Sequence, residues 1–384
     1  MTERPLNILI INCDWRNIFE TDFDELYKKL ERDQLEPEKN SFFFLSWSSS
    51  SYFKCQRERF TSVHLKTRWR FFRPFLDMMS VFIIPYYVLK YKLSPDVVIV
   101  YDLGFVISAR IVKLLRRSKV VLCLTNMPEI YSKTRRFGRM KALYSSLVEH
   151  IFVRLVDVGY TINETMKNYM VKTMGIREQK VVIFASNTIL RDIKHIKASQ
   201  EGTIRKKYSI KTDQKIILSI GRLEAEKGFP RLLEIFSKLS SSLVLVILGS
   251  GSMENELKTR ARDLGIANRV IFVGFVNRAG IWDYYQDADL FILLSNAEAL
   301  GLVFWEAMYM GVPAIGSTAE GIVESLGQNG ERGLIVEEDE SIDSIKKKID
   351  VVLTDSPQRD AMLLRAKKYV EHEIANKVTI NNTL

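Results

Sequence analysis

The chain has 384 residues, with 56 lysines and arginines against 46 aspartates and glutamates, and a formal net charge of +10. This length allows two domains with separate cores, and a hydrophobic content of 47% excludes a disordered chain. Three cysteines, Cys13, Cys55 and Cys123, show no metal or redox spacing and indicate reduced thiols rather than a disulfide framework.

Strands and helices alternate along the whole chain, which is typical of doubly wound parallel sheets. In the first half, apolar runs predict strands at residues 6–12, 41–47, 97–102, 119–124, 157–162 and 180–184. In the second half they predict strands near residues 215–220, 243–248, 269–273, 289–294, 312–316 and 333–336. Apolar residues at helical spacing predict helices from Gly228 to Ser240 and from Met253 to Leu264. The fold class is therefore expected to be α/β.

The domain boundaries follow from composition. Residues 1–190 are predicted to form the first domain and residues 191–355 the second, and the polar stretch 186–212 reads as a link between them. A last helix near 356–373, within residues 356–384, is expected to return to the first domain. The chain enters its first strand after Pro5 without a charged leader or apolar segment, so a cytoplasmic location is expected.

Positive charge is concentrated in the first half. Residues 1–190 hold 30 lysines and arginines against 19 acids, whereas residues 191–384 hold 26 against 27. Within the basic half, residues 66–90 combine a basic front with aromatic and aliphatic residues, and residues 133–141 form a second basic cluster. The first segment is typical of peripheral binding to an anionic membrane surface, although it equally fits a core helix over residues 75–90. Its apolar part is too short to span a bilayer.

Nucleic acid is the other polyanion that such charge would attract. The chain has no zinc-ligand spacing, no RNA-binding signature and no basic helix followed by heptads. Nucleic acid is therefore not expected as a partner.

Residues 295–313 contain two glutamates, Glu298 and Glu306, around a turn that opens a helix. The preceding apolar run predicts a buried strand, which puts Glu298 in a loop and Glu306 about one turn into a helix that ends at Gly311. A helix N-terminus at the carboxyl end of a parallel strand binds anions through its free N–H groups. An acid in the loop before the helix and a second acid in its first turns suit a ligand with both phosphates and sugar hydroxyls.

A second loop supplies positive charge. The strand near 215–220 is followed by Gly221-Arg222 and then by Lys227-Gly228. Cations that follow a parallel strand lie where they can converge on a diphosphate.

These blocks, with Gly249-Ser-Gly251 and the strand that ends at Gly274, resemble the retaining nucleotide-sugar glycosyltransferases of glycosyltransferase family 4. The resemblance covers residues 215–337 closely and the first half in outline. It implies the GT-B fold, in which two Rossmann-like doubly wound domains face each other across a cleft. The implied activity is transfer of a sugar, with retention, from a nucleotide-sugar donor to a glycan or lipid-linked acceptor, at the cytoplasmic face of the membrane.

The resemblance also implies roles for individual residues. Arg222 and Lys227 would hold the diphosphate, Glu298 the transferred sugar and Glu306 the ribose hydroxyls, with Glu298, Lys227 and Arg222 taking part in catalysis. The backbone around Leu300, Gly301 and Leu302 would complete the donor site. No protein nucleophile, metal or other cofactor is expected, because the departing phosphate itself helps to deprotonate the acceptor. Asp287-Ala-Asp289 matches a metal-binding Asp-x-Asp of another glycosyltransferase fold, but Asp289 opens a strand here, so the match is interpreted as accidental.

The first half departs from the family pattern at two points. A Gly-Gly pair expected after the first strand is replaced by Asn12-Cys13-Asp14, and a histidine expected after the fourth strand is absent near Asn126. Asp14 and Asn126 are the candidates for acceptor-side hydrogen bonding. Two alternatives stay open: a catalytically inactive GT-B scaffold that binds a partner subunit, and a nucleotide-sugar 2-epimerase, against which the glutamate pair argues.

Overall fold

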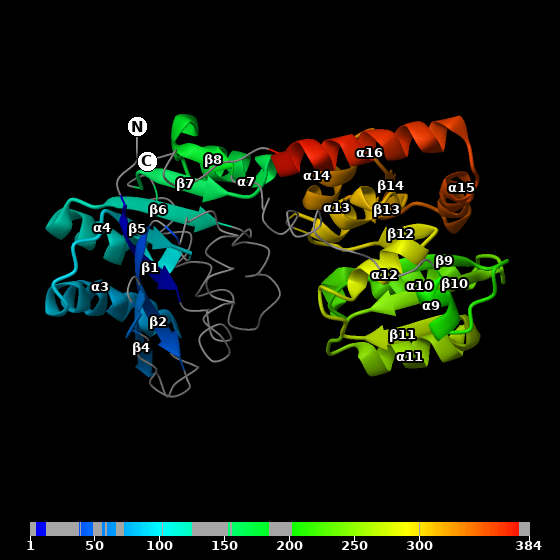
Figure 1. The fold of residues 1–384 in the computed structure, drawn as a ribbon, viewed down its shortest axis with the longest axis horizontal. Helices are drawn as coiled ribbons and strands as arrows, with labels where there is room; N and C mark the ends of the chain where they lie inside the picture. Colours follow the sequence, from blue (N-terminus) through cyan, green and yellow to red (C-terminus); the bar gives the residue numbers. More distant parts are fainter. Residues whose placement is uncertain are drawn as a thin grey trace. The chain divides into compact units, whose positions relative to one another are not determined.

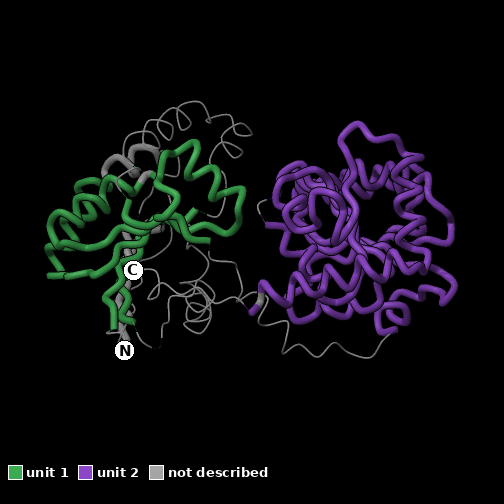
Figure 2. The backbone as a smooth tube through the Cα atoms, turned by 90° about the horizontal axis from the view of Figure 1, so that it is seen from above, with its two compact units in different colours: residues 1–189, 376–384 green, residues 190–375 purple. Residues whose placement is uncertain are grey.

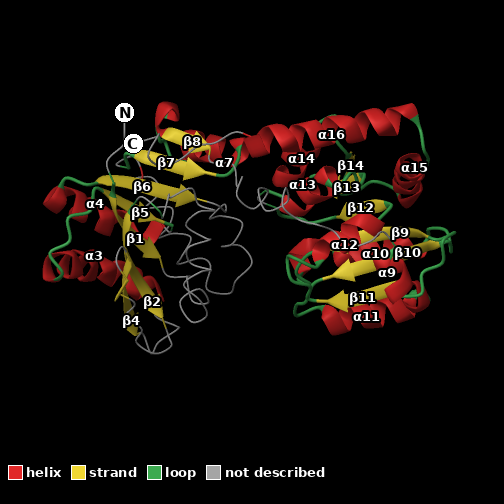
Figure 3. Ribbon diagram, viewed as in Figure 1, coloured by secondary structure: helices red, strands yellow, loops and turns green. Residues whose placement is uncertain are grey.

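Two parallel sheets, each in its own unit, make up the fold (Figures 1 and 2). The computed structural model describes residues 5–12, 38, 40–48, 56–57, 60–66, 73–101, 103–124, 153, 156–183, 202–298 and 300–375. Unit 1 comprises residues 1–189 and 376–384, and unit 2 comprises residues 190–375. Both units combine a largely parallel sheet with helices (Figure 3), so the α/β class predicted from the sequence is confirmed.

The sheet of unit 1 has eight strands in the order β3-β4-β2-β1-β5-β6-β7-β8, and every neighbouring pair is parallel except β3 and β4. Its strands are β1 (Asn7–Asn12), β2 (Ser41–Ser48), β3 (Gln56–Arg57), β4 (Phe60–Lys66), β5 (Val97–Val100), β6 (Lys119–Leu124), β7 (Val158–Thr161) and β8 (Val181–Ile183). The strand order reverses between β1 and β5, which run through the middle of the sheet. All six predicted strands of this half are confirmed.

The sequence reading missed β4 and its short partner β3. β4 pairs with β2 along its whole length, from Phe60 opposite Phe42 to Lys66 opposite Ser48. Its sequence alternates apolar and polar residues, as strands near the edge of a sheet do, whereas the continuous apolar runs that were sought mark central parallel strands. Residues 66–90, the basic and apolar segment described above, therefore begin at the last residue of β4.

The helices described in unit 1 are α3 (Arg73–Lys90), α4 (Val106–Arg116) and α7 (Glu164–Asn168), which continues into a π-helical turn over Tyr169–Thr173. α3 and α4 pack against each other, and their contact includes a buried hydrogen bond of 2.7 Å between the hydroxyls of Ser80 and Ser108. Ile84 and Val88 of α3 are buried, so this segment does form a helix of the unit 1 core. Among the residues that the structure describes, no helix is both long and apolar enough to cross a membrane.

The sheet of unit 2 has six parallel strands in the order β11-β10-β9-β12-β13-β14. Its strands are β9 (Lys215–Ile220), β10 (Leu243–Leu248), β11 (Val270–Gly274), β12 (Leu290–Leu293), β13 (Ala314–Ser317) and β14 (Leu334–Val336). The order reverses between β9 and β12, which lie side by side with Leu290 opposite Ile217. All six strands predicted for this half are confirmed, and the four central strands β10, β9, β12 and β13 are almost entirely buried.

The helices of unit 2 are α9 (Thr203–Lys207), α10 (Phe229–Ser237), α11 (Glu254–Asp263), α12 (Ile281–Asp287), α13 (Leu302–Tyr309), α14 (Glu320–Leu326), α15 (Ile342–Leu353) and α16 (Pro357–Ala375). α10 and α11 confirm the two helices that were predicted from spacing. α16 packs on α13, where the ring of Tyr369 meets Trp305 edge to face at 5.5 Å and Arg332 stacks on Tyr369. The helix expected near 356–373 is therefore part of unit 2.

The predicted link over residues 186–212 is too long at its C-terminal end. Residues 203–207 form α9, which belongs to unit 2 and packs on α12. This helix was not predicted because its residues are mostly polar. Its first N–H groups are bound by the side chain of Asp287, more than eighty residues further along the chain, and no local pattern predicts that contact.

Candidate functional site

The predicted site residues come from loops at the centre of the unit 2 sheet. Arg222 and Lys227 follow β9, and Glu298 follows β12. These two strands are neighbours at the point where the strand order reverses. Loops at the carboxyl ends of such strands diverge to opposite sides of the sheet and leave room for a ligand between them. The topology therefore puts these residues where an α/β protein binds small molecules.

Lys227 and Glu298 form an ion pair across these loops. The Nζ atom of Lys227 lies 2.6 Å from Oε2 of Glu298, and the two side chains are 14% and 18% exposed. Because both groups are largely shielded from water, their attraction exceeds that of a surface pair. The resemblance implied separate positions on the diphosphate and the sugar, and the structure joins the two residues directly.

Backbone contacts hold the two loops together around this pair. The N–H of Asn296 donates to the carbonyl of Glu226 at 2.8 Å and joins the two loops. The N–H of Gly321, in α14, donates to the carbonyl of Glu298 at 3.1 Å and ties the second loop to that helix. Gly228 has a φ of +69°, and a Cβ atom on it would lie 1.9 Å from the carbonyl oxygen of Leu294. Only glycine fits this approach. The Lys-Gly sequence thus seats Lys227 against the loop that carries Glu298.

Arg222 takes a different position in the same loop. Its side chain is 63% exposed and pairs with Glu226 at 2.7 Å. The loop is fixed by Glu224, whose carboxylate accepts from the backbone N–H and the hydroxyl of Ser252. The N–H hydrogen bond from Ser252 holds the pKa of Glu224 below its usual value. Arg222 is therefore a solvent-facing cation near Lys227 in sequence, with a separate acidic partner.

The start of α13 presents backbone N–H groups. Gly301, with a φ of +64°, is the N-cap residue, and no side chain caps the helix. Leu300 is buried beneath the turn, and Leu302 and Val303 are the first helical residues. The first N–H groups of a helix have no acceptor within the helix, so they favour an anion. The donor-binding roles of Leu300, Gly301 and Leu302 stay predictions.

Glu306 lies one turn into α13, as predicted, and is buried with a side chain only 3% exposed. Arg278 Nη1 donates to its Oε1 at 2.8 Å, and the hydroxyl of Tyr285 donates to its Oε2 at 2.9 Å. Burial raises the pKa of Glu306 above its usual value, against the opposing effects of Arg278 and Tyr285. The sequence reading missed both partners. Arg278 lies in the loop between β11 and α12, and this position after another strand was the available signal.

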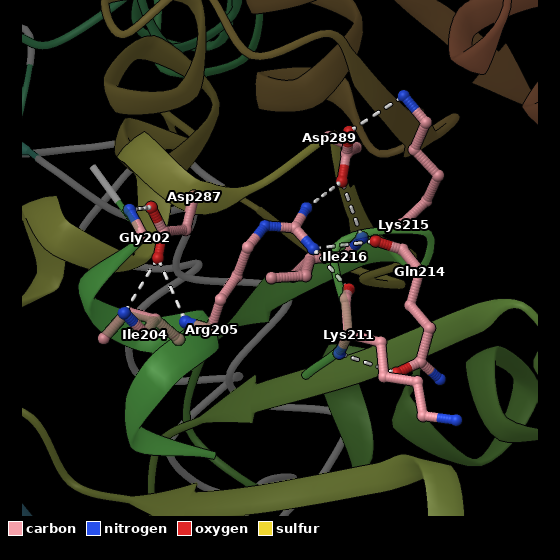
Figure 4. A network of polar contacts seen from close by, with 9 residues as sticks. All are labelled: Gly202, Ile204, Arg205, Lys211, Gln214, Lys215, Ile216, Asp287 and Asp289. Atoms are coloured by element: carbon pink, nitrogen blue, oxygen red, sulfur yellow. Dashed lines mark hydrogen bonds and ion pairs between the residues drawn. The ribbon is translucent and has the colours of Figure 1, made fainter. Parts of the chain in front are cut away.

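The two aspartates of the Asp-x-Asp match have structural partners (Figure 4). Asp287 accepts from the backbone N–H groups of Gly202 at 2.7 Å and Ile204 at 2.8 Å, at the start of α9. Asp289 accepts from Arg205 at 2.9 Å and from the N–H of Ile216 at 2.8 Å, and it also pairs with Lys215 at 3.1 Å. These carboxylates tie α9 to the central strands.

The other predicted site residues, Asp14 and Asn126, lie outside the residues that the structure describes, as do Cys13 and Cys55. Cys123 is a buried cysteine near the end of β6 and forms no disulfide. Within the described part of the chain, no three His, Cys, Asp or Glu side chains are grouped as they would be around a metal ion.

Comparison with protein families gives a match in unit 2. Residues 200–369 match the family model of the glycosyl transferases group 1. An uncharacterized glycosyltransferase of Methanocaldococcus jannaschii is 29% identical over 258 residues, 64% of this chain and 65% of that protein. The alpha-monoglucosyldiacylglycerol synthase of Streptococcus pneumoniae is 30% identical over 157 residues, 40% of this chain and 35% of that protein. The chain thus spans less than two thirds of the length of either relative.

Solved structures extend the likeness to both units. Sucrose-phosphate synthase from Thermosynechococcus elongatus has a TM-score of 0.74 at 15% identity, over 96% of this chain and 95% of its own. Anabaena HepE in complex with UDP and glucose has a TM-score of 0.68 at 14% identity, over the same shares of the two chains. At these identities the likeness shows the fold. The chain therefore has the GT-B fold. Its residues 200–369 are similar in sequence to the glycosyl transferases group 1.

Proposed function

We propose that this protein is a retaining glycosyltransferase that moves a sugar from a nucleotide-sugar donor to a glycan or lipid-linked acceptor. The observation that carries the proposal is the Lys227–Glu298 pair, which lies at the strand-order reversal of unit 2. A cation and a carboxylate side by side suit a donor whose anionic diphosphate adjoins a neutral, hydroxyl-rich sugar. The match of residues 200–369 to the glycosyl transferases group 1 supports the same reading.

In this proposal the donor diphosphate lies against Lys227 and the N-terminus of α13. Negative charge grows on the diphosphate as the bond to the sugar breaks, so cations and N–H groups there stabilise the transition state more than the ground state. Each charge-assisted hydrogen bond contributes about 1.5–3 kcal/mol. Arg222 is exposed and can turn toward the same phosphates. Solved relatives with the same fold have been obtained with UDP and glucose, which supports a nucleotide-sugar as donor.

Transfer with retention then needs no metal and no protein nucleophile. The bond between the anomeric carbon and the phosphate oxygen breaks, and the acceptor oxygen bonds to that carbon on the same face. The acceptor proton passes to the departing phosphate, so charge and atoms balance without a covalent enzyme intermediate. Lys227 and Arg222 offset the charge of the leaving group, and Glu298 holds the sugar near its reacting carbon.

The proposed acceptor side is a membrane surface, because α3 has an exposed apolar stripe. Phe82, Tyr86 and Leu89 are 69%, 57% and 52% exposed and follow one another at helical spacing. The adjacent α4 exposes Leu114 and Leu115. Since both helices turn their buried residues toward the sheet, these exposed residues face away from it. Apolar side chains that are grouped on a protein surface often mark a binding site for another protein or a membrane.

The charge around this stripe favours an anionic lipid surface. Exposed cations lie at the ends of the two helices: Lys90, Lys92, Arg117 and Lys119. The sequence contains no aspartate or glutamate between Asp77 and Asp96, or from residue 103 to residue 128. Apolar groups that insert among acyl chains and lysines that meet lipid phosphates act together in peripheral binding. We therefore place the enzyme peripherally on the cytoplasmic face of a membrane, with nucleic acid not a partner.

Release of nucleoside diphosphate tests the activity. The purified protein, mixed with membrane lipids and UDP-, GDP- or ADP-sugars, is expected to release the corresponding diphosphate. Glu298→Gln and Lys227→Ala should each lower that release at least about a hundredfold, a typical loss for a group that acts on the transition state. Lys258→Ala, which removes an exposed lysine of α11, is the matched control.

The outcomes separate the alternatives. No release from any donor would favour the inactive scaffold. Release of diphosphate together with a sugar epimerised at C2, without an acceptor, would favour the 2-epimerase. Release that both site variants leave unchanged would show that the reaction occurs elsewhere.

Co-sedimentation with vesicles tests the membrane surface. Binding to vesicles that contain phosphatidylglycerol should exceed binding to phosphatidylcholine alone and should weaken with salt. Phe82→Asp with Leu89→Asp should abolish it, whereas Leu364→Asp, at a leucine of α16 with 55% exposure, should not. Equal binding to neutral and anionic vesicles would contradict this placement.

A further inference from the structure

Glu306 is held at both of its carboxylate oxygens by residues from another element. Arg278 comes from the loop between β11 and α12, and Tyr285 comes from α12 itself. They donate to Oε1 and Oε2 at 2.8 and 2.9 Å. The Tyr285 hydroxyl also lies 3.0 Å from the carbonyl of Val303, one turn before Glu306 in α13. The carboxylate is therefore fixed in rotation as well as in position.

Both partners are themselves immobilised by aromatic packing. The guanidinium of Arg278 lies over the buried ring of Trp282, 5.6 Å from its centre. The ring of Tyr285 is fully buried and packs against Trp282 at 6.0 Å and Phe291 at 5.9 Å. These contacts give Arg278 and Tyr285 defined orientations before any ligand arrives.

Burial and the two hydrogen-bond donors, Arg278 and Tyr285, act in opposite directions on the pKa of Glu306. A carboxyl group at this depth favours its neutral form, so burial raises its pKa, and the cation of Arg278 is the strongest opposing influence. Tyr285 is the other titratable group that acts on it, and both groups come from the α12 side of α13. Each carboxylate oxygen has more than one lone pair, so both can accept a further hydrogen bond while they keep the present ones.

We propose that Arg278, supported by Tyr285, is a positioning residue that holds the Glu306 carboxyl group in a fixed orientation as an acceptor for the two vicinal hydroxyls of the donor ribose. This inference rests on the proposed function, because it assumes a nucleoside diphosphate in the site. Arg278, from the loop between β11 and α12, would then take part in donor recognition through Glu306. The Arg278–Glu306 pair would distinguish a ribose from a deoxyribose.

Calorimetric titration of the full chain with UDP, GDP and ADP is the first step, and the diphosphate that binds most tightly is then compared with its 2′,3′-dideoxy form. The wild type should bind the ribose form at least about tenfold more tightly, because charge-assisted hydrogen bonds are lost in the other. Arg278→Met, which keeps an apolar side chain over Trp282, should bind both forms about equally. Tyr285→Phe should show an intermediate ratio, and Arg262→Met on the exposed side of α11 is the control.

A pH profile and a conservative variant separate positioning from mere support of the fold. In Arg278→Met the ribose preference should require a higher pH than in the wild type, because the variant lacks the cation that opposes the effect of burial on the pKa of Glu306. Arg278→Lys should restore most of the preference at neutral pH, since the ammonium also favours the ionised carboxylate.

The failures of the two proposals are distinguishable. If the wild type binds none of the three diphosphates, the proposed function falls, and this inference with it. If the wild type prefers the ribose form and Arg278→Met keeps the same preference, or loses affinity equally for both forms at every pH, only the present inference is overturned.

Discussion

The ammonium of Lys227 lies 2.6 Å from a carboxylate oxygen of Glu298, in a protein whose proposed ligand carries two phosphates. The carboxylate thus occupies a position on Lys227 that a phosphate oxygen would take. In the proposed function a donor displaces this carboxylate from Lys227, and the displaced carboxylate then accepts hydrogen bonds from the sugar hydroxyls. The ion pair couples the two halves of the donor site.

This coupling predicts opposite effects of one substitution on binding and on transfer. Glu298→Gln removes the charge that competes for Lys227, so a nucleoside diphosphate without a sugar should bind more tightly. Partly shielded ion pairs of this kind contribute about 1 kcal/mol, which corresponds to roughly fivefold in affinity. Transfer should fall in the same variant, because the sugar loses its acceptor. Calorimetry with UDP, GDP and ADP measures the first effect and diphosphate release measures the second.

The matched control for this prediction is Glu226→Gln. Glu226 pairs with Arg222, whose side chain is 63% exposed, so solvent already screens that pair and its loss should change affinity less. Weaker binding of the diphosphates to Glu298→Gln would contradict an exchange of partners on Lys227.

Gly228 permits a test of how the two loops are joined. Gly228→Ala should lower the free energy of unfolding of unit 2 by more than about 2 kcal/mol, because strain at positive φ adds to a collision with the backbone of Leu294. Gly265→Ala is the control, since Gly265 has the same φ of +69° and open space around its Cβ position. It should cost only about 1–2 kcal/mol, the strain alone. Urea unfolding measures both, and equal losses would show that the approach to Leu294 is not tight.

The sequence predicted most of the strands and helices that are marked by a local pattern of apolar residues. The strands of unit 2 were predicted because each is a mostly apolar run, and Lys227 and Glu298 lie in loops after two of these strands, as predicted. The missed strand β4 has an alternating pattern and lies next to the two-residue edge strand β3. Local periodicity identifies central strands of a parallel sheet better than strands at its margin.

The sequence did not predict contacts between residues that are far apart in the chain. Glu306 was recognised, but Arg278 and Tyr285 precede it by 28 and 21 residues, and no local spacing links them. Likewise Asp287 was noted in the sequence only as part of an accidental Asp-x-Asp match, and the hydrogen bond that its carboxylate accepts from the N–H of Ile204, 83 residues earlier, was not predicted. Burial of an acid forces it to find partners, and only the topology decides which residues they are.

Asp287 should therefore act on stability. Asp287→Ala removes a carboxylate that accepts from the N–H groups of Gly202 and Ile204, and it leaves those donors without the acceptor. The free energy of unfolding should fall by about 1–3 kcal/mol. Asp339→Ala, at an exposed aspartate, should change it by less than about 0.5 kcal/mol. If added Mg²⁺ or Mn²⁺ raised the melting temperature of the wild type and not of Asp287→Ala, the carboxylate would be a metal ligand after all.

A carboxylate of unit 1 gives the stability a predicted pH dependence. Asp157 pairs with Lys113 and accepts from the N–H of Val120 at 2.8 Å. Burial opposes its ionisation, but these partners outweigh burial, so its pKa in the folded protein lies below the ordinary value. The folded state then binds fewer protons than the unfolded state as pH falls through this range. The contribution of Asp157 is complete above its unfolded pKa and is lost as pH falls through its lowered folded pKa.

Asp157→Asn should accordingly destabilise unit 1 at pH 7 by about 1 kcal/mol, a value limited by partial exposure of the pair. The difference from the wild type should shrink below about pH 4, where the unfolded aspartate is protonated. Urea unfolding at pH 7, 5 and 3 measures this, and Lys113→Met should show the same window because it removes the other partner. A difference that persists unchanged at pH 3 would mean that Asp157 stabilises unit 1 through its shape rather than its charge.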